Sequence, residues 1–305
     1  MTISLDLPRH TDETDVYYGR YAGLPTVDFS GAFDHPPGEA AWSVDDSSLA
    51  GFVEAAEAAQ VRALVLFGWD ETPHLVVEKL VAGAHRLPAL RAIFFGAIPQ
   101  EAQEMSWINQ TDVTPLLTAF PDLERLETRG SMGLRLSPVR HERLRMLRIE
   151  SGGLGGEVVR GVAACHLPAL EHLELWLGVD EYGGDYTVED LAPILTGDRL
   201  PALKHLGLQD SDRQDDVAAA VATAPIVARL DGLALSMGTL TDEGAEALLS
   251  GQPLTHLRRL DLHHHYLSDA MTARLRAALP TVDLDLDSQL DPDEDEGWLY
   301  TSVSE

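Results

Sequence analysis

One pattern of apolar and variable positions recurs along the chain. It consists of an apolar residue, two variable residues, an apolar residue, one variable residue and another apolar residue. Its clearest copies are LPALEHLELWL at 167–177 and LPALKHLGLQ at 200–209. Copies with substitutions occupy 87–96, 120–129, 140–149, 227–236 and 254–263. Because apolar and variable residues alternate at the end of each copy, each copy predicts a short β-strand with one buried face.

The spacing of the copies predicts a stacked-repeat protein. Their middle apolar positions recur about every 27 residues on average, which lies within the range of strand-plus-helix repeats. These positions are Leu64, Ile93, Leu126, Leu147, Leu173, Leu206, Leu233, Leu260 and Val282. Helix start signals stand between the strands, at Thr187, Thr241 and Ser268. Leu-Pro and Ala-Pro pairs then end the helices and lead the chain into the next strand.

These residues resemble leucine-rich repeats. The stretches LPALEHLELWLG, LSMGTLTDEGAEALL and LTHLRRLDLHHHYLSD are similar to a family of actinobacterial leucine-rich repeat proteins, with repeats of the ribonuclease-inhibitor type. The resemblance covers about residues 60–286. It implies an α/β solenoid of horseshoe shape, with a parallel sheet on the concave side and helices on the convex side. It implies no particular ligand, because this scaffold binds many unrelated ones.

The ends of the chain depart from the repeat. Residues 1–60 fit an N-terminal cap, since a solenoid needs atypical ends to cover its terminal apolar faces. Residues 61–286 form the repeats, and 287–305 form a tail. The tail opens with an acidic run over 287–296 and continues with alternating residues at 297–303 that fit a capping strand over the last repeat. The alternative is a tail that docks a partner.

Composition narrows the classes of partner. The 305 residues carry 50 acidic and 22 basic side chains, a formal net charge of −28. Such a surface repels phosphate and anionic lipid, so nucleic acid and membranes are not expected, and a protein or peptide of basic character is favoured. The alternative is that the charge serves solubility. Cys165 is the single cysteine and the N-terminus has no secretion signal, so we expect a cytoplasmic protein. The oligomeric state is left open.

The variable positions of the strands line the predicted concave face. In the middle repeats they are charged and aromatic, and a Trp flanked by charges is typical of an interface anchor. The candidates for protein binding are Arg129, Arg148, Glu150, His172, Glu174, Trp176, Asp261 and His263. The alternative is that cross-strand ion pairs, such as Glu127 with Arg148, satisfy one another. The first two repeats are apolar at these positions, which predicts that the cap or a loop covers them.

Two repeats are longer than the others, and both carry the extra residues after the strand. The added stretches are 97–110, which contains Trp107, and 178–186, which contains Tyr182, Asp185 and Tyr186. Insertions in repeat arrays map to loops on one face, which is often the binding face. Aromatic rings beside carboxylates suit a cationic or peptide ligand. We therefore add these four residues to the candidates, with an ordinary polar surface loop as the alternative for 178–186.

The strongest sign of other chemistry is the histidine run His263–His265. On a strand, His263 and His265 share a face, and zinc needs three or four converging ligands. Against a metal, the usual ligand spacing is missing, and these imidazoles can instead bond backbone or a neighbouring repeat. No motif for hydrolysis or phosphate binding is present. We therefore expect a non-enzymatic protein- or peptide-binding scaffold without a cofactor. The alternative is a metal-dependent or substrate-binding enzyme centred on His263 and His265.

Overall fold

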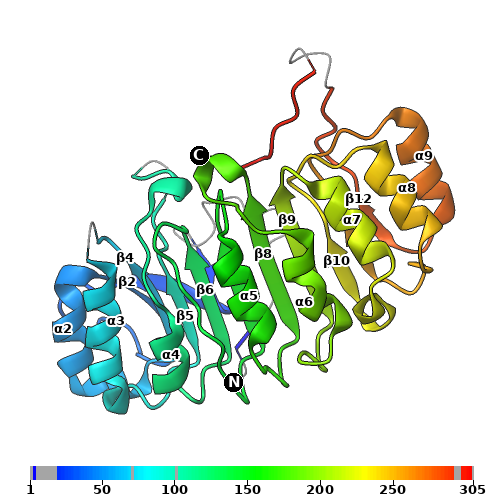
Figure 1. Ribbon diagram of the computed structural model, residues 1–305. Coiled ribbons are helices and arrows are strands. Elements are labelled where there is room, and N and C mark those ends of the chain that lie inside the picture. Colours follow the sequence, from blue (N-terminus) through cyan, green and yellow to red (C-terminus); the bar gives the residue numbers. More distant parts are fainter. Residues whose placement is uncertain (1–2, 5–18, 70–71, 100–101, 292–296, 304–305) are drawn as a thin grey trace. The chain divides into compact units, whose positions relative to one another are not determined.

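The computed structural model describes residues 3–4, 19–69, 72–99, 102–291 and 297–303. It divides into two compact units. Unit 1 contains residues 1–150 and 165–170, and unit 2 contains residues 151–164 and 171–305. Strands and helices alternate along unit 2, and along unit 1 from residue 41 to residue 129 (Figure 1).

Unit 1 is built on a sheet whose neighbouring strands are parallel, except that β1 pairs antiparallel with β2. Leu64 pairs with Ile93, Ile93 with Leu126, and Leu126 with Leu147, which confirms the predicted register. The strands are β1 (Arg20–Tyr21), β2 (Leu24–Asp28), β3 (Ala41–Asp45), β4 (Ala63–Phe67), β5 (Ala92–Phe95), β6 (Arg125–Arg129) and β7 (Met146–Glu150).

Unit 2 is built on a second run of parallel strands. These are β8 (His172–Gly178), β9 (His205–Ser211), β10 (Gly232–Ala234), β11 (Arg259–Asp261) and β12 (Asp283–Asp285). Leu206 pairs with Leu173 and with Leu233, as predicted. Leu260 pairs with Leu284, so the predicted position Val282 is wrong by two residues. A shift of two keeps the same side chains on the same face of a strand, so alternation alone does not separate these registers.

Helices cover one face of the strands in each unit (Figure 1). The α-helices are α2 (Asp46–Glu54), α3 (Pro73–Ala82), α4 (Thr114–Ala119), α5 (Gly156–Ala164), α6 (Ala192–Thr196), α7 (Gln214–Ala222), α8 (Asp242–Ser250) and α9 (Asp269–Ala278). The short 3₁₀ turns are Ala56–Gln60, Ala84–Arg86, Met105–Trp107, Asp180–Tyr182, Val188–Leu191 and Pro225–Arg229. We call the sheet face opposite the helices the open face.

The predicted helix starts are confirmed by their caps. The Thr187 side chain accepts from the backbone at Asp190, whose own side chain accepts from the Thr187 backbone. The Thr241 hydroxyl accepts from the Glu243 amide, and the Ser268 hydroxyl from the Met271 amide. Leu173 and Leu206 are fully buried, as is almost all of Cys165, in agreement with a core-facing cysteine. No described helix is long and apolar enough to cross a membrane.

A residue with positive φ follows the strand in most repeats. In unit 1 the residues directly after β4, β5 and β6 are Gly68, Gly96 and Gly130, and Ala22, with φ of 52°, follows β1. In unit 2 the residues are Gly178 and Asp210, at the ends of β8 and β9, and Met237, His264 and Ser288, shortly after the next three strands. A left-handed residue turns the chain sharply out of the strand. Glycine adopts this conformation freely, whereas an L side chain is strained by it.

The N-terminal part of the chain lies on the open face of unit 1. Ile3, Tyr21 and Ala22 form one apolar cluster with Val65 and Phe94, which stand at open-face positions of β4 and β5. This confirms that the apolar start of the predicted concave surface is covered. Within the predicted cap, β2 and β3 continue the parallel sheet, since Val27 pairs with Trp42 and Trp42 with Leu64.

The C-terminal part lies across the strand ends of unit 2. Residues 297–303 form no strand, so the predicted capping strand is wrong. Instead, the Ser302 amide donates to the Met237 carbonyl oxygen at 2.7 Å, and the Val303 amide donates to Asp210 Oδ1 at 2.9 Å. The segment thus runs back along the turns after β10 and β9. Residues 292–296 of the acidic run lie outside the described residues.

Candidate functional site

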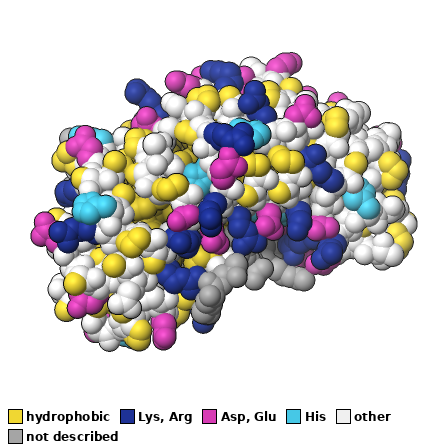
Figure 2. All heavy atoms as spheres, turned by 90° about the horizontal axis from the view of Figure 1, so that it is seen from below, with side chains coloured by type: hydrophobic (Ala, Val, Ile, Leu, Met, Phe, Trp, Pro, Cys, Tyr) yellow, Lys and Arg dark blue, Asp and Glu magenta, His cyan; other side chains and the backbone are white. Residues whose placement is uncertain are grey.

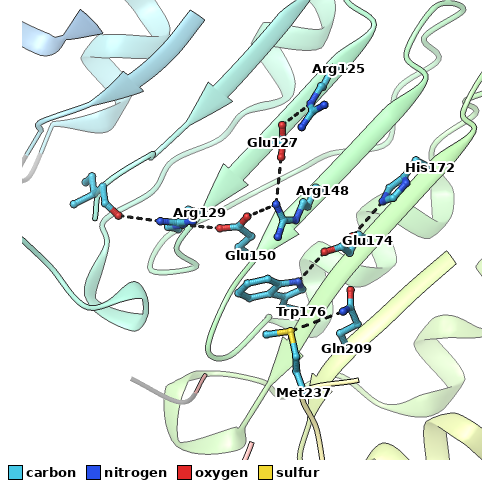
Figure 3. A network of polar contacts seen from close by, with 11 residues as sticks. Arg125, Glu127, Arg129, Arg148, Glu150, His172, Glu174, Trp176, Gln209 and Met237 are labelled. Carbon is cyan, nitrogen blue, oxygen red and sulfur yellow. Dashed lines mark hydrogen bonds and ion pairs between the residues drawn. The ribbon is translucent and has the colours of Figure 1, made fainter. Parts of the chain in front are cut away.

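A buried ladder of charges occupies the open face of unit 1 (Figure 3). Arg125 Nε lies 2.6 Å from Glu127 Oε1, and Arg148 Nη1 lies 3.5 Å from Glu127 Oε2. Arg148 Nη1 also lies 2.7 Å from Glu150 Oε1, whose Oε2 accepts from Arg129 Nε at 2.5 Å. All five side chains are at most 4% exposed. The two glutamates thus link the three arginines in one continuous network.

This ladder corrects the prediction that Arg129, Arg148 and Glu150 meet a partner. Arg125 Nη1 donates to the Ser4 carbonyl oxygen at 2.9 Å, and its guanidinium lies 5.0 Å from the centre of the Tyr21 ring. Arg129 Nη1 donates to the Ile98 carbonyl oxygen. The N-terminal segment and the 97–110 loop therefore enclose these charges, which satisfy one another as the alternative interpretation held. Glu127 beside Arg125 raises the pKa of that guanidinium, although burial opposes the charge.

A second polar network lies on the open face of unit 2. Trp176 Nε1 donates to Glu174 Oε1 at 3.0 Å, and His172 Nε2 lies 3.1 Å from Glu174 Oε2. Gln209 Nε2 donates to the Ser236 hydroxyl at 2.8 Å and lies 3.8 Å from Met237 Sδ. Trp176 is 1% exposed, so the prediction of an exposed interface anchor is wrong. Its ring packs within the protein, and its one polar atom is bonded to Glu174.

His205 joins this network from the neighbouring strand. It pairs with His172 in the register of β8 and β9, and the two imidazole rings stack with centroids 4.1 Å apart and planes 14° apart. Burial, reinforced by the nearby His172, lowers the pKa of His205 to about 3. His205 is therefore neutral near pH 7. The sequence could have indicated this stacking. In the EHL and KHL of the two clearest copies, a histidine directly precedes the middle leucine, so the two histidines occupy equivalent positions on neighbouring strands.

The insertion 178–186 is largely occupied by internal contacts. The Tyr186 side chain is buried, its hydroxyl bonds to the Ser211 hydroxyl, and burial raises its pKa to about 12. Asp185 Oδ1 accepts from the Gly156 amide at 2.7 Å, which places its carboxylate at the start of α5. Tyr186 is therefore not available to a partner, and Asp185 is engaged at a helix start. Tyr182 is half-buried.

The histidine run does not form the metal cluster that was considered as the alternative. His263 Nδ1 lies 2.7 Å from Asp261 Oδ1, and this carboxylate raises the pKa of His263 although burial opposes its charge. His265 is buried, with Nε2 against the Leu286 carbonyl oxygen and Nδ1 accepting from the Leu267 amide. His264 Nε2 lies 3.1 Å from the Tyr300 carbonyl oxygen. The imidazoles of His264 and His265 are thus bonded to backbone atoms, and that of His263 to a carboxylate.

The predicted candidate Trp107 is exposed, at 54%. Hydrogen bonds hold its loop to neighbouring segments. Trp69 Nε1 donates to the Asn109 carbonyl oxygen at 2.8 Å, and Gln110 Nε2 donates to the Arg129 carbonyl oxygen at 2.6 Å. The Gln110 backbone amide also donates to the Met132 carbonyl oxygen at 2.7 Å, and the Met132 side chain is 43% exposed. Two large apolar side chains thus stand at the carboxyl ends of β5 and β6.

Basic and acidic side chains are mixed on one face of the molecule. Figure 2 shows Lys and Arg side chains interleaved with Asp and Glu on the face that it draws. Arg91 lies 3.8 Å from Asp122 and 3.9 Å from Glu124, and Arg143 lies 3.1 Å from Asp122. These basic side chains are therefore paired with acidic ones on the surface.

Together, the recurrent register, the one-sided helices and the left-handed strand ends define an α/β protein of leucine-rich repeat type. A Bacteroides fragilis protein solved by a structural genomics consortium is similar to this chain at 29% identity, with a TM-score of 0.77 over 84% of this chain and 73% of its own. A Listeria monocytogenes internalin aligns at 15% identity and a TM-score of 0.31 over 81% and 72% of the two chains, which is too low to carry an argument. No family model and no curated protein matches.

Proposed function

We propose that this chain is a non-enzymatic scaffold that binds a protein or peptide through the strand-end loops of unit 1, with Trp107 as the anchoring side chain. The observation that carries the proposal is the exposure of Trp107 on a loop fastened by hydrogen bonds. Tryptophan contributes strongly to binding when a partner buries it, and a preorganised loop loses little entropy on binding. The exposed Met132 extends the apolar area beside it.

The chemistry of the partner follows from the charge of the chain. With a net charge of −28, the scaffold attracts partners of basic character over distances comparable to the Debye length. We therefore expect a partner that presents an apolar side chain to Trp107 within a basic surface. Raising the salt concentration should slow the association more than it speeds the dissociation.

The test compares two single substitutions in unit 1. Partners are captured on the full chain from cytoplasm of the source organism, identified by mass spectrometry, and purified for affinity measurements. Trp107→Ala should weaken binding of the authentic partner roughly tenfold or more, the loss expected for a buried aromatic anchor. Leu75→Ala is the matched control, since Leu75 is 39% exposed on α3. Equal affinities for wild type and Trp107→Ala would overturn the proposal.

A further inference from the structure

The best-formed group of metal-ligating side chains lies on β8 and β9 of unit 2. His172, Glu174 and His205 each offer one ligand atom, and the three atoms all lie within 4.8 Å of one another. In the part of the chain that the structure describes, no other three His, Cys, Asp or Glu side chains converge in this way. The feature is independent of Trp107 and of the binding surface proposed above.

We infer that His172, Glu174 and His205 form a binding site for a divalent transition-metal ion of the Zn²⁺ type. Two imidazoles and one carboxylate form a donor set that zinc accepts, with a fourth position left for water or another ligand. Calcium and magnesium are disfavoured, because they prefer sites made of oxygen.

The distances fit an ion after a small movement of one ring. Bonds of about 2.0–2.1 Å in a tetrahedral site place neighbouring ligand atoms roughly 3.3 Å apart. His172 Nε2 and Glu174 Oε2 already lie 3.1 Å apart. The stacked rings of His172 and His205 are nearly parallel, so their lone pairs do not yet converge on one point. Binding therefore tilts the His205 ring out of the stack and toward the ion.

The surroundings accommodate the ligands and orient the carboxylate. A Cβ atom at Gly232 would stand 2.7 Å from His205 Nδ1, and a Cβ atom at Gly207 would stand 2.9 Å from Glu174 Cγ. Glycine at both positions therefore lets the His205 and Glu174 side chains lie directly against the neighbouring backbone. Trp176 Nε1 donates to Glu174 Oε1, which turns Oε2 toward His172. A hydrogen bond to the second oxygen of a ligating carboxylate is the usual support of a metal ligand.

Zinc binding to the full chain without an affinity tag provides the test. Titration calorimetry and metal analysis after dialysis should give one Zn²⁺ per chain. His205→Gln and Glu174→Gln should each lower the affinity roughly tenfold or more, because each removes one of three ligands. His263→Gln is the matched control, since His263 lies on the same open face next to Asp261 and should leave binding unchanged.

A spectroscopic readout separates a site from loss of fold. Co²⁺ bound to the wild-type chain should show the intense visible absorption of a tetrahedral ion, which His205→Gln should abolish while its circular dichroism stays that of the wild type. The inference is overturned if zinc does not bind stoichiometrically, or if His205→Gln binds it as tightly as wild type. It is equally overturned if His263→Gln loses as much affinity as His205→Gln.

Discussion

The two units differ in the residues that end their strands and in the side chains that lie on their open faces. Unit 1 has glycine in the left-handed conformation after β4, β5 and β6, and it pairs three arginines with two glutamates on its open face. Unit 2 places Asp210, Met237, His264 and Ser288 in the left-handed conformation, and its open face carries the two stacked histidines.

In each unit, a terminal segment of the chain forms hydrogen bonds with some of these residues. In unit 1, the N-terminal segment bonds Arg125 of the charge ladder. In unit 2, the C-terminal segment bonds Asp210, Met237 and His264, which are three of the four strained residues. The difference indicates that a repeat can keep non-glycine residues at a left-handed turn when another part of the chain contributes bonds there.

The largest effect is expected from breaking the charge ladder of unit 1. Arg148→Met removes the cation shared by Glu127 and Glu150 and leaves each glutamate with a single arginine. Removing one partner from a buried ion pair typically costs about 3–5 kcal/mol of unfolding free energy. Urea denaturation followed by circular dichroism measures the loss. Arg143→Met is the control, because Arg143 is 65% exposed and its surface ion pair contributes about 0–1 kcal/mol. Similar losses in the two variants would mean that the ladder is not held as a buried network.

The next effect concerns the strand-end turns. Gly130 has φ near 94°, and a Cβ atom there would stand 2.6 Å from Ile108 Cβ, so Gly130→Ala should cost about 1–3 kcal/mol of stability. Gly31→Ala separates strain from crowding, since Gly31 has φ of 101° with nothing within 4 Å. It should cost less than Gly130→Ala.

The opposite substitution, from a residue with a side chain to glycine, tests a left-handed turn of unit 2. Ser288 is exposed with φ near 59°, so Ser288→Gly should gain about 1 kcal/mol by relieving the left-handed strain. The same denaturation assay measures the gain. A loss of stability would show that the strain at this turn is already offset by side-chain contacts.

The smallest effect is a pH-dependent one at Asp210. Burial raises the pKa of Asp210 well above the ordinary value of 3.8, and its Oδ2 has no hydrogen-bond partner among the described residues. Because the folded state holds the proton more tightly than the unfolded state, stability from this residue falls as pH rises above about 3.8. Asp210→Asn retains an acceptor for the Val303 amide and does not ionise. It should therefore stabilise by about 1 kcal/mol at pH 8 and by less at pH 4.

Denaturation of wild type and Asp210→Asn at both pH values tests this expectation. Asp216→Asn, an exposed position on the adjacent α7, controls for the loss of one negative charge. If the two variants respond alike at pH 8, the burial of Asp210 does not limit stability.

The repeats were predictable from the sequence because their signals are local. The leucines of the recurring phrase alternate with variable residues, and they pair in the predicted register from Leu64 to Leu147 and from Leu173 to Leu260. The register of the last strand was predicted wrongly because Val282, Leu284 and Leu286 all alternate with polar residues. The caps at Thr187, Thr241 and Ser268 were equally readable, since each bonds to a backbone amide within three residues.

The binding candidates were less predictable because exposure depends on distant parts of the chain. Arg148 and Glu150 were placed on the open face correctly, yet they are buried in ion pairs. Asp185 was assigned to a ligand, whereas it accepts from Gly156, which lies far from it in the sequence. His205 was overlooked, because its importance comes from its stacking on His172 across two strands.

The sequence by itself therefore determined the repeat, its strands and most of its register, since hydrophobic period and capping act within a few residues. Only the tertiary structure decided which open-face side chains are covered. Ile3 and Val303 contact residues far from them in the chain, and no periodicity encodes such contacts. Whether a charged or aromatic side chain faces solvent depends on these coverings, and that is why Trp107 stands exposed while Trp176 is buried.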